Sequence, residues 1–96
     1  MSIVVRFTPD TLTTEMYDES VRLLGERGNL PADGQLLHIC FGTSPNLVVS
    51  EVWESREQWR AFLEQLIPVL STVGIDPGDP EVFEVHNMLS ASVPAR

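Results

Sequence analysis

The pattern of hydrophobic and polar positions divides the chain into six elements. Four short runs are rich in β-branched, aromatic and other apolar side chains and predict strands: residues 2–8, 36–42, 47–54 and 81–90. Two longer runs repeat apolar side chains at intervals of three and four and predict amphipathic helices: residues 13–27 and 56–73. The predicted order is therefore strand, helix, strand, strand, helix, strand.

The ends of the second helix carry recognisable signals. Ser55 and Gln58 have the spacing of a capping box, in which two side chains satisfy free backbone N–H groups of the first turn. Gly74 is a natural C-terminal stop. Pro68 removes one backbone donor inside the pattern, so we expect it to kink the helix or divide it at about Ile67.

The connections predict how the strands pair. Residues 42–46 form a short turn, so the second and third strands are expected to make a hairpin. Two right-handed crossovers around this hairpin give a four-stranded antiparallel sheet with both helices on one face. The predicted class is a ferredoxin-like α+β fold, in a single domain that covers residues 1–96.

Both faces of the predicted sheet are apolar. In the second strand Leu37, Ile39 and Phe41 face one side, and Leu36, His38 and Cys40 face the other. Two helices can cover only one face. Burial contributes about 25 cal/mol per Å², so a second exposed face would forgo much stabilisation in so small a domain. We therefore expect a second copy of the chain to cover it in a homodimer; the alternative is a partly apolar face in contact with solvent.

Charge and composition exclude several classes of function. The net charge is −8, and all six basic residues are arginine. Without lysine, the chain cannot form a side-chain Schiff base or a Walker-type phosphate loop. An acidic chain repels polyanions, so we expect neither nucleic acid nor membrane as a partner. One cysteine, Cys40, allows no internal disulfide, and no signal or membrane span is recognisable; we expect a cytoplasmic protein.

The chain resembles the dimeric α+β barrel superfamily, which includes the antibiotic-biosynthesis monooxygenase-like proteins, and is most similar to small uncharacterised bacterial members. The residues that carry the resemblance span nearly the whole chain: residues 4–7 (Val-Val-Arg-Phe), Tyr17-Asp18, Gly34 with His38, Val52-Trp53-Glu54-Ser55, Phe62, Pro68 with Gly74, and Val85-His86-Asn87. The resemblance implies two sheets that close into a barrel, with a mainly apolar pocket between each sheet and its helices.

The same resemblance implies several possible activities. Some members oxidise polycyclic phenols or quinols with O₂ and without a metal or flavin, others degrade haem, and others show no clear activity. The haem-degrading members hold iron with a histidine on the second helix. Residues 56–73 contain no histidine, so haem degradation is not expected and no cofactor is predicted.

Four residues are candidates for the chemistry of a cofactor-free oxygenase: Tyr17, His38, Trp53 and His86. Such an enzyme needs a base to accept a phenolic proton, and histidine can serve. It also needs donors that hold the resulting anion, and Tyr O–H and Trp N–H groups can serve. For each of the four the alternative is a structural role in the core or at an interface, and Trp53 is further expected to wall a pocket.

Other groups of residues give weaker evidence for a functional site. His38 and Cys40 share a strand face, but a zinc site needs three or four ligands and no second cluster is present, so no metal is predicted. Glu51 and Glu84 are possible functional acids; the alternatives are solvated edges or interface pairs with Arg6.

The first functional hypothesis is a small dimeric pocket protein, related to cofactor-independent monooxygenases, for an aromatic or apolar small molecule. The second is a non-catalytic ligand-binding or stress-response module of the same fold.

Overall fold

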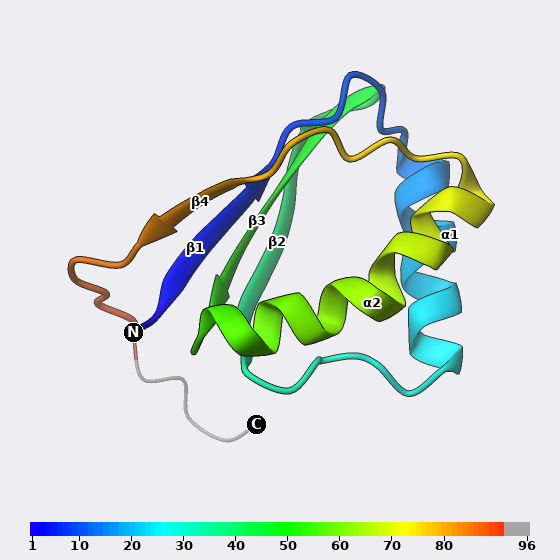
Figure 1. Cartoon of the computed structure of the whole chain (residues 1–96). Helices are drawn as coiled ribbons and strands as arrows, with labels where there is room; N and C mark the ends of the chain where they lie inside the picture. Colours follow the sequence, from blue (N-terminus) through cyan, green and yellow to red (C-terminus); the bar gives the residue numbers. More distant parts are fainter. Residues whose placement is uncertain (92–96) are drawn as a thin grey trace.

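The six elements follow the predicted order in a computed structural model that describes residues 1–91. Their bounds are β1 Ile3–Phe7, α1 Thr14–Glu26, β2 Gln35–Thr43, β3 Asn46–Trp53, α2 Arg56–Val73 and β4 Glu81–Glu84. The strands pair antiparallel in the spatial order β2-β3-β1-β4. Both helices lie on the same face of the sheet (Figure 1). The predicted ferredoxin-like α+β fold is confirmed.

The predicted helix ends are largely confirmed. Ser55 has an extended backbone, and its Oγ accepts the backbone N–H of Gln58 at 3.2 Å. The Ser55 hydroxyl also donates to Oε1 of Gln58 at 2.9 Å, so the second half of the expected capping box is a contact between side chains. Gly74 ends α2 with a φ of 88°, the left-handed conformation that favours glycine.

Pro68 does not divide α2. The helix runs without a break from Arg56 to Val73, so of the two expected effects of Pro68, a kink or a division at about Ile67, the division does not occur. Pro68 and Glu64, whose carbonyl loses its helical donor, both lie on the exposed side of the helix. Water can bond that carbonyl there, which lowers the cost of the missing hydrogen bond. Within the described residues, neither helix is long and apolar enough to cross a lipid bilayer.

One face of the sheet forms the core with α2. Ile3 pairs with Trp53 and Val5 with Glu51, and all four of these residues are buried. Cross-strand partners share a face, so the helix-facing rows of β1 and β3 form a continuous buried surface. The side of α2 that packs against this core is apolar and consists of Trp59, Phe62, Leu66 and Val69.

Two strand predictions are corrected. The fourth strand ends at Glu84 rather than at residue 90. Its partner β1 begins at Ile3. The Val85 N–H still donates to the Ser2 carbonyl (3.0 Å), but β1 offers no residue beyond this point with which β4 could pair. In β2 the register shifts between Gln35 and Leu37, and Leu36 is 46% exposed instead of packing on the helix-facing side with His38. A loose tail is also expected from the sequence at residues 91–96, of which 92–96 lie outside the described residues.

The other face of the sheet is largely apolar, as predicted, and also holds one polar row of Arg6, Ser50 and Glu81. Val4 pairs with Phe83, and Val52 pairs with Leu37. Phe83 and Leu37 are each 53% exposed, in contrast to the buried row on the helix-facing side. We call this the open face: Val4, Leu37, Ile39, Phe41, Val48, Val52 and Phe83. A second copy of the chain over it remains a prediction.

Candidate active site

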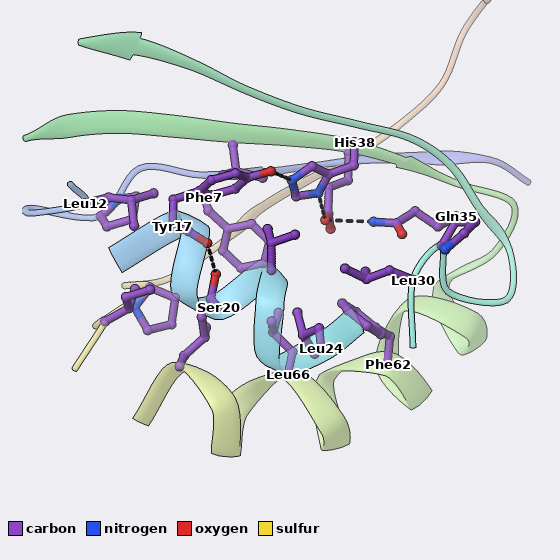
Figure 2. Close-up of a pocket in the computed structure, with 18 residues that line it drawn as sticks. Phe7, Leu12, Tyr17, Ser20, Leu24, Leu30, Gln35, His38, Phe62 and Leu66 are labelled. Atoms are coloured by element: carbon purple, nitrogen blue, oxygen red, sulfur yellow. Dashed lines mark hydrogen bonds and ion pairs between the residues drawn. The ribbon is translucent and has the colours of Figure 1, made fainter. Parts of the chain in front are cut away.

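A cavity of about 280 Å³ lies between the sheet and the two helices. Its walls are mainly apolar and include Phe7, Leu12, Leu24, Leu30, Phe62 and Leu66 (Figure 2). The volume is near the lower end of the range for small-molecule sites, about 300 Å³ upward. Among the described residues that line it, Glu51 is the one carboxylate and arginine is absent, so the cavity suits a neutral ligand rather than an anion.

Polar side chains gather on the sheet side of this cavity. Tyr17 reaches it from the buried stripe of α1, and His38 from β2. Glu51 stands directly opposite His38 on β3, and Gln35 opens β2. Helix α1 and the hairpin of β2 and β3 therefore bring a phenol, an imidazole and a carboxylate into one hydrogen-bonded chain (Figure 2).

The first link of the chain joins Tyr17 and His38. Oη of Tyr17 lies 2.7 Å from Nε2 of His38. The two rings are nearly parallel, with centroids 5.8 Å apart and an angle of 25° between their planes. The His38 side chain is 33% exposed, so the Tyr17–His38 end of the hydrogen-bonded chain is within reach of solvent or a ligand.

The second link joins His38 and Glu51. Nδ1 of His38 lies 2.6 Å from Oε2 of Glu51, whose side chain is only 4% exposed. A buried carboxylate is costly unless several donors satisfy it. Here Nε2 of Gln35 donates to Oε2 at 3.0 Å, and the indole N–H of Trp53 donates to Oε1 at 3.1 Å. Both carboxylate oxygens are therefore satisfied.

The environment keeps Tyr17 protonated. Burial raises the pKa of Tyr17 above its usual value of 10.0, and the nearby Cys40, Glu51 and Asp18 raise it further. A phenolate would be less well solvated here and would face negative charge. At neutral pH Tyr17 therefore acts in hydrogen bonding as a neutral hydroxyl.

The four predicted site residues have different positions. Tyr17 and His38 line the cavity and contact each other. Trp53 is fully buried and does not line the cavity, although its indole N–H bonds to Glu51 and its ring packs 5.4 Å from that of Phe62. The expectation that Trp53 walls the pocket is wrong because its side chain is enclosed in the core. His86 is exposed, lies beyond the end of β4 and does not line the cavity.

Glu51 is a candidate site residue to which the sequence pattern alone gives little weight. It is neither a solvated edge nor a partner of Arg6, because Arg6 pairs with Ser50 and Glu81 on the opposite face of the sheet. The signal was present in the alternation: Glu51 has the same parity as Val49 and Trp53, which face the core. Glu84, by contrast, is exposed on the edge strand β4.

Cys40 and His38 do not form a metal site. Among residues 1–91 no group of three or more His, Cys, Asp or Glu side chains is arranged to hold a metal ion. Burial raises the pKa of the Cys40 thiol, and Asp18 raises it further, so at neutral pH the reactive thiolate form is less populated than for a free cysteine.

Comparison with solved structures identifies the fold. No family model matches the chain, and no curated protein matches it. An antibiotic biosynthesis monooxygenase candidate from Chloroflexus aurantiacus J-10-fl is similar in structure, with a TM-score of 0.66 and 16% identity over 94% of this chain and 98% of that one. The chain has the antibiotic-biosynthesis monooxygenase fold.

Two further structures with this fold are similar to the chain. SnoaB from Streptomyces nogalater, a cofactor-independent oxygenase, has a TM-score of 0.60 and 19% identity over 94% of this chain and 96% of that one. A second monooxygenase candidate, from Deinococcus radiodurans, has a TM-score of 0.59 and 16% identity over 97% of this chain and 100% of that one. The expected resemblance is confirmed in fold, and at these identities it extends to the fold alone.

Proposed function

We propose that the chain binds a neutral, largely aromatic small molecule in the cavity and oxidises it with O₂, as a small cofactor-independent monooxygenase. One observation carries the proposal. The hydrogen-bonded chain from Tyr17 through His38 to Glu51 lies in the wall of a mainly apolar cavity. The similarity in fold to a cofactor-independent oxygenase adds to it.

The residues suit the first step of such a reaction. A phenolic substrate becomes a much better electron donor once it loses its proton, and His38 is the base within the cavity wall. The Glu51 carboxylate, 2.6 Å from Nδ1, stabilises the imidazolium that forms when His38 accepts a proton. The apolar walls limit access of water to the anion and hold the ring of the substrate at the polar end of the cavity, which Tyr17 and His38 line.

A second function is ligand binding without turnover. The observation that favours it is that both ring nitrogens of His38 already have partners, and both oxygens of Glu51 as well. A polar cluster whose hydrogen bonds are all satisfied can have a purely structural role, which is to fix the shape of the cavity. The two functions share the same binding site and differ in whether O₂ is consumed.

Oxygen uptake with a panel of hydroquinones separates the two. The proposal predicts uptake by the wild-type protein, and a loss of about 100-fold or more in His38→Ala, because general-base catalysis typically contributes that much. His86→Ala is the matched control, since it removes the other histidine from an exposed position outside the cavity. Equal rates for wild type and His38→Ala, or no uptake by either, would remove the catalytic claim.

We further propose that a second copy of the chain covers the open face in a homodimer. Leu37, Ile39 and Phe41 on β2 are 39–53% exposed and lie side by side with other apolar residues. A contiguous apolar surface of this kind is typical of an interface. Sedimentation should give a dimer at micromolar concentration. Ile39→Glu should give a monomer, and Ile67→Glu, at an exposed apolar position on α2, should remain dimeric. A monomeric wild-type protein would refute this assembly.

A further inference from the structure

The direction of the hydrogen bonds around Glu51 is fixed by Gln35 and Trp53. Oε1 of Gln35 accepts the backbone N–H of Ala32 at 3.1 Å, so the amide nitrogen must face Glu51. The indole of Trp53 can only donate, and it donates to Oε1 of Glu51. Both carboxylate oxygens therefore act as acceptors.

This direction continues through His38. A carboxylic acid is a stronger acid than an imidazolium, so the proton between Glu51 and His38 belongs to Nδ1. In the neutral imidazole, Nε2 then carries a lone pair and can only accept. Its partner is Oη of Tyr17 at 2.7 Å, so Tyr17 must donate its hydroxyl proton to His38.

The direction of the Tyr17–His38 hydrogen bond determines what Tyr17 offers to a ligand in the cavity. A tyrosine that donates to His38 has only its oxygen lone pairs left for other partners. Tyr17 lines the cavity together with His38, and the contact between them is open to solvent. The hydroxyl oxygen of Tyr17 therefore presents a hydrogen-bond acceptor to a ligand in the cavity.

We infer that Glu51 is a positioning residue that makes Tyr17 an acceptor and thereby selects ligands that carry a hydroxyl donor over ligands of the same size that carry only a carbonyl. This inference rests on the proposed function, because it concerns the ligand of the same cavity. Removal of Glu51 would free His38 to adopt the other tautomer, in which Nε2–H donates to Tyr17. The Tyr17 hydroxyl would then turn outward and favour acceptors.

The same geometry defines a proton path. The ligand hydroxyl gives its proton to Oη of Tyr17, while Tyr17 gives its own proton to Nε2 of His38. His38 keeps the proton on Nδ1, and its new positive charge is paired with the Glu51 carboxylate 2.6 Å away. One neutral ligand and one neutral imidazole become one anion and one imidazolium, so protons and charge balance. In this path Tyr17 touches the ligand and His38 acts through it.

Calorimetric binding of α-tetralol and α-tetralone tests the inference, because these molecules share one ring skeleton and carry a hydroxyl and a carbonyl oxygen, respectively, at the same carbon. Wild type should bind α-tetralol about tenfold more tightly, the range of one hydrogen bond against an unsatisfied acceptor. Tyr17→Phe and Glu51→Gln should each lose this preference. Glu84→Gln is the control, since the same change at an exposed carboxylate should leave the preference intact.

Each outcome has a separate meaning. Equal affinities in the wild type, or a preference that survives in Tyr17→Phe, would overturn the inference and leave the proposed pocket in place. Binding of neither probe to the wild type would remove the proposed aromatic site, and the inference with it. Should Glu51→Gln fail to fold, as judged by its thermal melt, Tyr17→Phe still decides, because it keeps the packing of the ring and removes only the hydroxyl.

Discussion

Nδ1 of His38 lies 2.6 Å from Oε2 of Glu51, across a single pair of directly opposed residues on β2 and β3. This contact connects the exposed and buried parts of the candidate site. On one side His38 meets Tyr17, and on the other Glu51 is held by Gln35 and Trp53. A carboxylate with a 4% exposed side chain is unusual in so small a core, and such groups cluster at functional sites.

The ionisation of Tyr17 is the first prediction. Because burial and nearby negative charge raise its pKa, the phenolate absorbance of the folded protein should appear with a midpoint above pH 10.0. Tyr17 is the one tyrosine in the chain, so the signal reports this residue alone. Glu51→Gln should lower the midpoint, because it removes one of the negative charges. A midpoint at or below 10.0 in the folded wild type would contradict the described environment.

The raised pKa of Tyr17 also predicts how the stability of the protein depends on pH. Folded Tyr17 holds its proton to a higher pH than unfolded Tyr17. Above about pH 10 the folded state therefore binds more protons, and the free energy of unfolding contributed by this group falls as pH rises. Urea unfolding from pH 9 to 11 should show a steeper loss of stability in wild type than in Tyr17→Phe. Identical slopes would mean that Tyr17 is not perturbed.

Removal of the buried carboxylate is the third prediction. Glu51→Ala leaves the indole N–H of Trp53, the amide of Gln35 and Nδ1 of His38 without their acceptor. We expect the free energy of unfolding to fall by about 3 kcal/mol or more. Glu84→Ala, at an exposed strand position, should change it by less than about 0.5 kcal/mol. Similar losses in both variants would show that the cluster around Glu51 contributes no special stability.

The approach of Gly34 to α2 gives a fourth prediction. Gly34 has a φ of 83°, a backbone conformation that strains any residue with a Cβ, and an added Cβ would also displace the flexible end of the Gln58 side chain. Gly34→Ala should therefore cost about 1–3 kcal/mol. Gly25→Ala is the matched control, because Gly25 lies in α1 with open space around it and should stabilise the protein by about 0.5–1 kcal/mol. Thermal or urea unfolding measures both, and a neutral Gly34→Ala would contradict this geometry.

Much of the fold was predictable because local patterns determine it. The alternation in β1 and β3, the hairpin at residues 42–46 and the caps at Ser55 and Gly74 all depend on near neighbours in sequence. The end of β4 was not predictable, because the strand stops where its partner β1 begins. The local pattern of residues 85–90 carries no information about that partner.

The candidate site was predictable only in part. Tyr17 on the inward stripe of a predicted helix and His38 in a predicted strand are visible in sequence, and they do meet. The pairing of His38 with Glu51 depends on the register between β2 and β3, which a single sequence does not determine. Trp53 was identified as a site residue, yet its place behind a buried carboxylate rather than in the cavity wall follows from tertiary packing.

The most direct test of the account is the imidazole spectrum of the protein during titration with α-naphthol, followed by nuclear magnetic resonance. The chain has two histidines, so each ring gives a separate set of signals and one serves as an internal reference. The account predicts saturable shifts of the His38 ring, which lines the cavity, and none of the exposed His86 ring. Shifts confined to His86, or no shift of either ring at saturating ligand, would contradict it.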